Sequence, residues 1–214
     1  MTSPLAVITG GSTGIGRHLV SALGAAGYSV AFNYRKSSAA AAILLAELKA
    51  GGQPALGLEC DVGIMADVQH FYARVADWHG DAPSLLVNNA GVQTWSPMLD
   101  LAEAKWDDVI RTNLKGCFLN TQAAARLMVQ AGRGGAIVNI GSGCNKLAFP
   151  RLVDYTASKG GIEQFTKVAA VELGPHGITV NCVAPGAIAT ERTALESPDY
   201  AAKWGPITPL ARVY

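Results

Sequence analysis

The sequence predicts a doubly wound α/β fold, in which one parallel sheet carries helices on both faces. Short apolar runs alternate with longer stretches that show helical periodicity along most of the chain. The first apolar run ends in a glycine cluster that leads straight into such a stretch, as at the start of a Rossmann-like sheet. The chain has 214 residues, of which 50% are hydrophobic and 15% charged, and this composition excludes a disordered chain. We therefore expect a single domain over residues 1–214.

The first half of the chain shows three strand and helix pairs in order. Apolar residues predict strands at 5–8, 29–33 and 55–59. Helical spacing predicts helices at 14–26, 37–50 and 66–78. Gly27 ends the first helix, Ser37 or Ser38 can cap the second, and Gly51 and Gly52 end it.

The second half continues the alternation and then departs from it. Strands are expected at 85–87, 136–140 and 178–183, and helices at about 106–129 and at 155–173. After Gly186 the chain is rich in proline and polar residues, and only a short helix-like stretch at 197–204 follows. No further strand is expected, so one edge or layer of the sheet is left unfinished.

Charge, cysteine count and hydropathy exclude several classes of protein. The 17 basic and 16 acidic residues give a net charge of +1, which argues against nucleic-acid binding. The four cysteines are scattered, so neither a metal site nor a disulfide framework is expected. The N-terminus has no signal-peptide pattern, and no apolar run is long enough to span a membrane. We expect a soluble, cytoplasmic protein.

The glycine turn after the first strand is a candidate anion site. It reads Thr9-Gly10-Gly11-Ser12-Thr13-Gly14-Ile15-Gly16 and opens a helix. Glycines permit a tight turn and a close approach to a ligand, and the helix N-terminus offers free N–H groups and the positive end of its dipole. A pyrophosphate suits this place, although a glycine-rich turn without a ligand is the alternative.

The spacing of these glycines resembles that of the short-chain dehydrogenase/reductase family. Further motifs of that family occur in order: Asn88-Asn89-Ala90-Gly91, Asn113, Ser142, Tyr155-Thr156-Ala157-Ser158-Lys159, and Pro185-Gly186-Ala187-Ile188-Ala189-Thr190. The resemblance covers essentially the whole chain. Members similar to it include sugar dehydrogenases and 3-oxoacyl-[acyl-carrier-protein] reductases. The resemblance implies that the carboxyl ends of the strands bind a nicotinamide cofactor.

The cofactor contacts that the resemblance implies lie in six segments. Asp61 would accept a hydrogen bond from the adenine amino group beside Val62, and Asn88 and Ala90 would bound the adenosine ribose. As alternatives, Asp61 could cap a strand end and Asn88 could tie two strands together. The full set of expected cofactor-binding residues is Gly10, Ser12, Thr13, Gly14, Ile15, Gly16, Tyr34, Arg35, Lys36, Asp61, Val62, Asn88, Ala90, Gly91, Tyr155, Lys159, Pro185, Gly186, Ile188 and Thr190.

The end of the second expected strand favours NADP over NAD. An NAD site places an acid there for the ribose 2′-hydroxyl. This chain instead has Tyr34, Arg35 and Lys36, and Arg35 can bind a 2′-phosphate in a bidentate way. Alternatively, Arg35 and Lys36 could both be solvated loop residues with no ligand. Thr13 is neutral where some NADP-binding relatives carry a base, so NAD remains possible.

Tyr155 and Lys159 are four residues apart on an expected helix and so share one face. A phenol has a pKa of about 10, and a neighbouring ammonium group lowers it. The resemblance implies that Tyr155 is the acid/base, that Lys159 binds the nicotinamide ribose, that Ser142 bonds the reacting oxygen, and that Asn113 holds a water in a proton relay. Each also has a structural interpretation: a solvated helix face for the pair, and a turn or cap for the serine.

The sequence leaves the substrate class and the oligomeric state open. Residues of about 187–205 are expected to form the substrate loop, and a sugar or polyol, a ketone or a 3-oxoacyl compound remains open. The resemblance implies a dimer or tetramer in a full-length form, whereas a chain ending here is expected not to form the usual tetramer. The alternative function is a truncated, catalytically impaired protein that only binds nucleotide.

Overall fold

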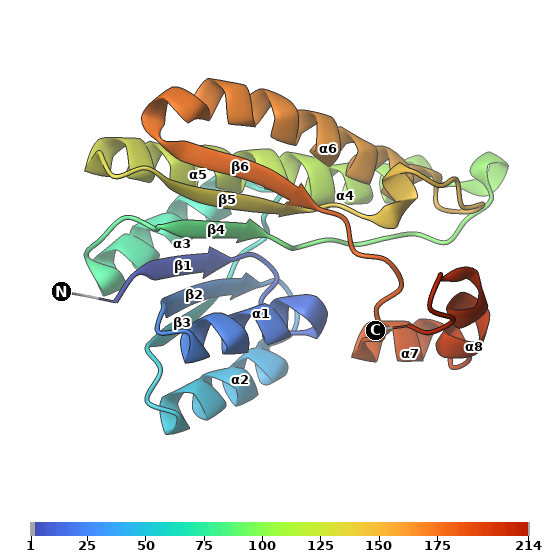
Figure 1. Ribbon diagram of the computed structural model, residues 1–214, viewed down its shortest axis with the longest axis horizontal. Coiled ribbons are helices and arrows are strands. Elements are labelled where there is room, and N and C mark those ends of the chain that lie inside the picture. The colour runs from blue at the N-terminus through green and yellow to red at the C-terminus, as the bar shows by residue number, and fades with distance from the viewer. Residues whose placement is uncertain (1–2, 214) are drawn as a thin grey trace.

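Six strands form one parallel sheet in the computed structural model, which describes residues 3–213 (Figure 1). Their order across the sheet is β3-β2-β1-β4-β5-β6, and every pair is parallel. The direction of winding therefore reverses between β1 and β4. This confirms the predicted fold class. The strands are β1 Leu5–Ile8, β2 Ser29–Tyr34, β3 Ala55–Glu59, β4 Leu85–Asn88, β5 Gly135–Ile140 and β6 Ile178–Val183.

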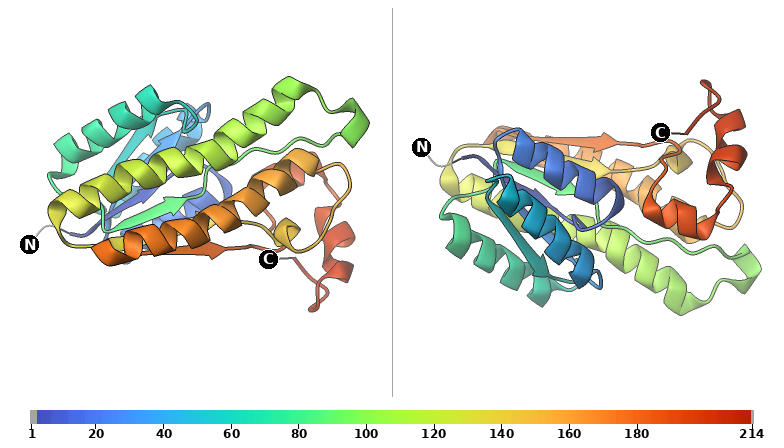
Figure 2. Two further views of the ribbon diagram at one scale, coloured as in Figure 1. Left: turned by 90° about the horizontal axis from the view of Figure 1, so that it is seen from above. Right: turned by 90° about the horizontal axis from the view of Figure 1, so that it is seen from below.

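Helices cover both faces of the sheet (Figure 2). On one face lie α1 Gly14–Ala25 and α2 Ser38–Ala50. On the other lie α3 Met65–His79, α5 Gly116–Ala131 and α6 Val153–Leu173. The short helix α4 Glu103–Val109 precedes α5.

The two-residue period of the central strand explains why both faces are covered. Leu5 and Val7 belong to a buried cluster shared with α3 and α5, whereas Ala6 and Ile8 belong to a second cluster shared with α1 and α2. All four side chains are at most 1% exposed. A strand buried on both faces must be apolar throughout, which is why the first strand could be recognised from sequence.

Two helical regions differ in detail from the prediction. The stretch expected as one helix over 106–129 contains a π-helical turn, Ile110–Lys115, between α4 and α5. The stretch expected at 197–204 contains the short helix α8 Tyr200–Trp204, and a second short helix that was not expected, α7 Glu191–Glu196, precedes it. Thr190 and Thr193 cap α7 reciprocally, in a Thr-x-x-Thr variant of the usual capping box.

The expected serine cap of α2 is also corrected. Ser37 stands at the N-cap position, yet its side chain makes no capping bond. Its hydroxyl lies 2.6 Å from the Ser12 hydroxyl instead. This bond ties the start of α2 to the glycine turn, so the serine contributes to the shape of the turn.

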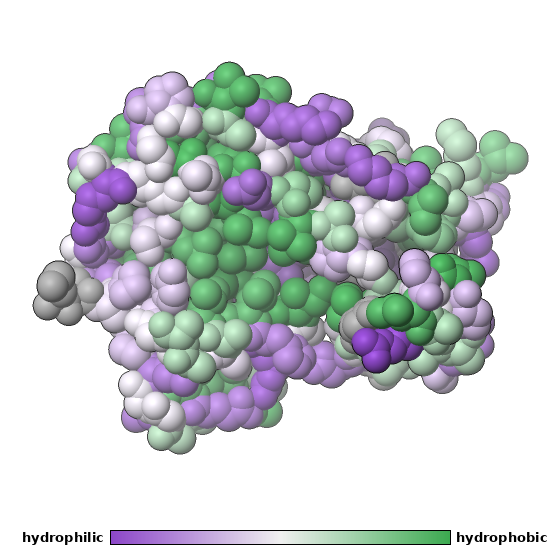
Figure 3. Space-filling view, in the orientation of Figure 1, coloured by the Kyte–Doolittle hydropathy of each residue, from purple (hydrophilic) through white to green (hydrophobic). Residues whose placement is uncertain are grey.

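The sheet face over β4 to β6 on the α1 side is exposed in the described chain, and hydrophobic surface gathers there (Figure 3). Val183 is 51% exposed on the edge strand β6, while Val138 and Ile140 are half-buried. The expected open edge is therefore present. No helix within residues 3–213 is long and apolar enough to cross a membrane.

Candidate active site

A groove of about 490 Å³ runs along the carboxyl ends of the strands, where the winding reverses. Its walls come from the glycine turn, the ends of β2, β3 and β4, the part of α6 that carries Tyr155 and Lys159, and residues 190–191 at the start of α7. A doubly wound sheet binds its ligands at this place. Parts of several sequence segments singled out above, the glycine turn and the Tyr155–Lys159 pair among them, thus meet in one cavity.

Glycines shape the first wall because side chains would not fit there. Gly10 and Gly14 adopt φ angles of +65° and +53°, which L side chains rarely adopt. A Cβ on Gly16 would collide with the carbonyl oxygen of Gly10 and with the Asn89 amide. The turn therefore folds tightly onto the helix start, and a ligand can approach its backbone closely.

Hydrogen bonds from the end of β4 hold this turn in place. The Asn89 side chain donates to the carbonyls of Thr9 at 3.0 Å and Gly10 at 3.1 Å. The Thr9 hydroxyl accepts from the backbone N–H groups of Asn89 and Ala90, each at 3.0 Å. Asn89 belongs to the Asn88-Asn89-Ala90-Gly91 motif, and the motif alone does not indicate this role. Its side chain is a clamp that joins the two walls of the groove.

The start of α1 fits a pyrophosphate. Thr13 occupies the N-cap position in extended backbone but makes no side-chain cap bond, and the first turn has no acidic residue. The first N–H groups of α1 and the positive end of its dipole are thus available to an anion. Together with the glycine cradle, this arrangement suits a dinucleotide.

Tyr155 and Lys159 lie on one face of α6 and both line the groove. The Lys159 Nζ lies 5.6 Å from the centroid of the Tyr155 ring and donates to the Ile140 carbonyl at 2.6 Å. Lys159 is only 4% exposed. A buried ammonium ion held against the end of β5 places its positive charge next to the phenol.

Ser142 and Asn113 are buried beside this pair but do not line the groove. The Ser142 hydroxyl accepts from the Cys144 N–H at 3.2 Å. The Asn113 side chain bonds both the N–H and the carbonyl of Val92, at 2.8 and 2.9 Å, and donates to the Ser158 hydroxyl at 2.9 Å. The side-chain amide of Asn113 is therefore used in hydrogen bonds within the fold.

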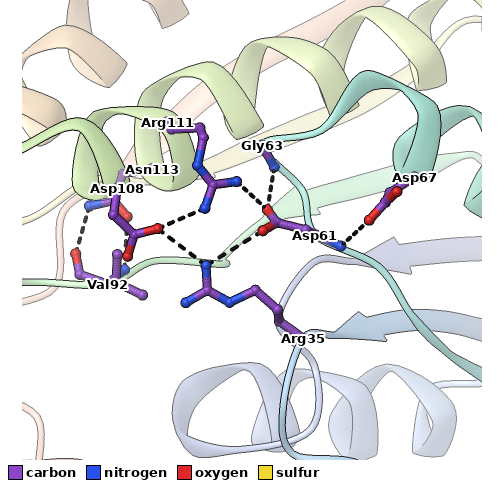
Figure 4. A network of polar contacts seen from close by, with 8 residues as sticks. All are labelled: Arg35, Asp61, Gly63, Asp67, Val92, Asp108, Arg111 and Asn113. Carbon is purple, nitrogen blue, oxygen red and sulfur yellow. Dashed lines mark hydrogen bonds and ion pairs between the residues drawn. The ribbon is translucent and has the colours of Figure 1, made fainter. Parts of the chain in front are cut away.

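Four charged side chains form a network at the end of the groove beside β2 and β3 (Figure 4). Arg111 donates to Oδ1 of Asp61 at 2.9 Å and to Oδ1 of Asp108 at 2.7 Å. The Nη1 of Arg35 lies 3.6 Å from Oδ2 of Asp61 and 3.3 Å from Oδ1 of Asp108. Arg35, the expected phosphate ligand, is thus paired with two acids.

Both acids in this network are held ionised. Burial acts to raise the pKa of Asp61, but the Gly63 N–H, the Arg111 hydrogen bond and the charges of both arginines lower it below its ordinary value. At Asp108 burial also opposes ionisation, and the contacts with Arg111 and Arg35 again lower the pKa. The network therefore contains two positive and two negative charges at neutral pH.

The predicted cofactor residues divide into those that line the groove and those that do not. Lining residues are Gly10, Ser12, Thr13, Gly14, Ile15, Tyr34, Arg35, Asp61, Val62, Ala90, Gly91, Tyr155, Lys159 and Thr190. Outside the lining are Gly16, Lys36, Asn88, Pro185, Gly186 and Ile188.

Asn88 and Lys36 are two predicted residues outside the lining: the first points into the fold and the second is exposed to solvent. Asn88 donates to Thr121 at 2.9 Å and to Asn139 at 2.8 Å, so its side chain ties β4 to β5 and α5, the structural alternative noted from sequence. Lys36 is exposed.

Asp108 and Arg111 belong to the site but were missed from sequence. They lie on α4 and on the π-helical turn, in a stretch whose apolar spacing indicated only a helix. A Cβ on Gly63 would lie 2.8 Å from two atoms of the Arg111 side chain, so that side chain packs directly on the backbone after Asp61. The i,i+3 spacing of Asp108 and Arg111 was the available signal.

The expected substrate loop, with α7 and α8, lies beyond the strand ends (Figure 1), and Thr190 and Glu191 at the start of α7 line the groove. Thr190 is 3.8 Å from the position of a Cβ on Gly14, so the segment before α7 touches the glycine turn. The Trp204 ring contacts Phe149 at 5.2 Å and Tyr200 at 5.9 Å between centroids. These aromatic contacts join α8 to the loop before α6. Among the described residues, no group of His, Cys, Asp and Glu could hold a metal ion.

Known proteins share both the sequence and the structure of this chain. The family model described as "short chain dehydrogenase" matches residues 4–201. The chain is 38% identical over 207 residues to a 3-oxoacyl-[acyl-carrier-protein] reductase of Staphylococcus aureus (strain Mu50), covering 97% of this chain and 83% of that one. A similar reductase of Synechocystis is 38% identical over 193 residues, which cover 90% of this chain and 77% of the other.

Solved structures show the same relationship. A short-chain type dehydrogenase/reductase from Mycobacterium marinum has a TM-score of 0.90 and 36% identity, covering 99% of this chain and 82% of that one. The acetoin dehydrogenase from Enterobacter cloacae has a TM-score of 0.88 and 33% identity, covering 100% and 83%. The chain therefore belongs to the short-chain dehydrogenase/reductase family and is an NAD(P)-dependent oxidoreductase.

Proposed function

We propose that the protein interconverts a carbonyl and a secondary alcohol with NADP(H) as the preferred cofactor. One observation carries this proposal: the Tyr155–Lys159 pair of α6 and the glycine turn of α1 line the same groove. A dinucleotide laid along this groove with its pyrophosphate on the turn would bring its nicotinamide toward the pair. The bound nicotinamide would supply or accept the hydride.

The side chains of the site then have separate roles. Tyr155 gives a proton to the substrate oxygen or takes one from it, and the Lys159 ammonium group lies 5.6 Å from the centroid of its ring. Ser142 orients the reacting oxygen from the end of β5. The side-chain amide of Asn113 already forms hydrogen bonds with Val92 and Ser158. A water of the expected proton relay would therefore have to bind the main chain of Asn113 within the π-helical turn.

Three substrate classes fit the walls: a sugar or polyol, a ketone, or a 3-oxoacyl compound. The relatives named above include 3-oxoacyl reductases and an acetoin dehydrogenase. Phe149 packs against Trp204 of the segment that we assign to the substrate loop, and this apolar pair favours the ketone and 3-oxoacyl classes. We propose these two classes first, in a cytoplasmic protein whose four cysteines are free thiols.

The test is a fluorescence titration of the purified chain with NADPH and with NADH, followed by turnover assays. Substrates for these assays are a 3-oxoacyl thioester, an acyclic hydroxyketone or diketone, and a sugar. Saturable binding with NADPH preferred, together with turnover of at least one class, is the expected result. Binding without any turnover would support a protein that only binds nucleotide, and no binding would contradict the proposal.

Replacing Arg35 tests the cofactor preference directly. Arg35→Leu removes the expected partner of the 2′-phosphate, and charge-assisted hydrogen bonds of this kind contribute about 1.5–3 kcal/mol. We therefore expect NADPH affinity to fall by about 10- to 100-fold while NADH affinity changes little. Arg133→Leu is the control, because Arg133 precedes β5 at the opposite end of the strands. Equal losses for both nucleotides would contradict the assigned role.

Self-association is proposed through the outer face of α5 and α6. A second groove, of about 410 Å³, lies there and is lined by apolar residues that include Phe118, Ala125, Val129, Phe165, Val168 and Leu173. Phe118 is 42% exposed and Val168 58% exposed. Two such helix pairs packed together would bury this surface in a second copy of the chain.

A charge placed on that face should dissociate the assembly. We expect light scattering to show a dimer or larger species for the wild type and a monomer for Val168→Asp. Ile43→Asp is a matched control, because Ile43 is 57% exposed on α2, away from this face. A monomeric wild type would contradict the proposal.

A further inference from the structure

Arg35 is the most loosely held member of the network in Figure 4. Arg111 makes the short contacts, at 2.7 Å to Asp108 and 2.9 Å to Asp61. Arg35 makes the long ones, at 3.3 and 3.6 Å, and both use the same nitrogen, Nη1. The guanidinium of Arg35 can therefore turn toward a ligand while Asp108 stays fixed by Arg111.

Asp108 would lie close to any anion that Arg35 binds. Its Oδ1 is the oxygen shared between Arg111 and Arg35. A phosphate on another nitrogen of Arg35 would lie roughly 6 Å from this oxygen, given ordinary hydrogen-bond lengths. The second acid, Asp61, is more buried: its side chain is 15% exposed, whereas that of Asp108 is 40% exposed. Asp108 is thus the acid that both repels the phosphate and can be changed with least damage.

We propose that Asp108 is a specificity-determining residue that limits the preference of this site for the 2′-phosphorylated nucleotide. The inference rests on the proposed function, since it takes the adenosine end of the groove to bind the cofactor. The carboxylate weakens 2′-phosphate binding in two ways. It repels the phosphate, and it competes for Arg35. The ribose 2′-hydroxyl of NAD(H) is neutral and meets neither penalty.

The expected size of the effect follows from Coulomb's law. Removing one negative charge roughly 6 Å from a phosphate of nearly two charges changes affinity by about five- to tenfold, even when the interaction is screened as in water. The effect should shrink as salt is added, because screening acts over about 10 Å at 0.1 M. A change caused only by altered packing would not depend on salt in this way.

The experiment compares Asp108→Asn with Asp107→Asn in the full chain. Asp107 is the neighbouring acid on α4 and is exposed, and the ion pairs of Arg35 among the described residues are with Asp61 and Asp108. Both substitutions remove the same charge from the same helix. The probes are adenosine 2′,5′-bisphosphate and adenosine 5′-monophosphate, which differ only in the 2′-phosphate, and binding is measured calorimetrically at low and high salt. Asp108→Ser provides a second variant with a different side chain.

We expect Asp108→Asn and Asp108→Ser to tighten binding of the bisphosphate by about five- to tenfold at low salt, with the monophosphate nearly unchanged. Asp107→Asn should change neither by more than about twofold, because exposed charges at a greater distance are screened. Weaker bisphosphate binding in Asp108→Asn would overturn the inference, since Asp108 would then be holding Arg35 ready for the phosphate. An equal gain in Asp107→Asn would overturn it as well.

The two probes distinguish a failure of the Asp108 role from a failure of the nucleotide groove. If the wild type binds both probes and Asp108→Asn binds them as the wild type does, this inference is wrong and the proposed nucleotide groove stands. If the wild type binds neither probe, the groove assignment is wrong and the inference falls with it.

Discussion

Tyr155→Phe is expected to lower kcat by about 10²- to 10⁴-fold, the usual contribution of a positioned acid or base. The phenylalanine keeps the ring and loses only the hydroxyl that exchanges a proton with the substrate. The Tyr155 ring lies against Lys159, and this lysine is held independently by the Ile140 carbonyl. The groove should therefore keep its shape, and NADPH affinity should change by no more than about twofold.

Steady-state kinetics and a parallel NADPH titration of the same preparation check this expectation. Tyr28→Phe serves as the control, because Tyr28 lies between α1 and β2, outside the groove lining. Ordinary turnover in the Tyr155 variant would remove this residue from the acid/base role. A loss of nucleotide binding that matches the loss of turnover would instead assign Tyr155 a binding role.

Gly16→Ala is expected to abolish tight nucleotide binding and to destabilise the fold. The added Cβ would overlap the Gly10 carbonyl and the Asn89 amide that clamps the turn. Overpacking of this kind costs about 1–3 kcal/mol, which exceeds the gain of about 0.5–1 kcal/mol from alanine in a helix. Because the turn must shift to accept the methyl group, the N–H groups that would hold the pyrophosphate move with it.

Urea unfolding and NADPH titration measure the two consequences of Gly16→Ala. We expect a lower free energy of unfolding and an affinity reduced by more than about tenfold. Gly51→Ala is the matched control: Gly51 ends α2, and a Cβ there meets its nearest atoms at 3.5 Å or more, with φ at −79°. If Gly16→Ala bound NADPH as well as the wild type, the tight turn would not be needed for the site.

Much of this molecule follows from local sequence. β1 is apolar at every position because both of its faces are buried, so its strand could be predicted without tertiary information. The glycine turn could be predicted because backbone geometry restricts the residues it tolerates. Tyr155 and Lys159 could be paired because four residues on a helix bring side chains to one face.

The charged network of Figure 4 could be recognised only from the tertiary structure. Arg35 follows β2, Asp61 follows β3, and Asp108 and Arg111 lie on α4 and the π-helical turn. Sequence shows the sign of each charge but not the distances between them, and these distances decide whether Arg35 acts as an isolated cation or as part of a balanced network. For the same reason sequence could not show that Arg111 packs on Gly63.

The sequence also did not determine the direction in which the Asn88 and Asn113 side chains point. At the ends of β4 and within the π-helical turn, Asn88 and Asn113 could each have faced the groove or the interior, since an amide is compatible with both. The positions of Asn139, Thr121 and Val92 decided it, because they supply acceptors for the Asn88 amide nitrogen and a donor for the Asn113 amide oxygen. Sequence by itself thus determined the fold class and the shared helix face of Tyr155 and Lys159, which depend on local periodicity. Tertiary structure alone decided which polar side chains reach the groove and how its charges balance, because those depend on contacts between distant segments.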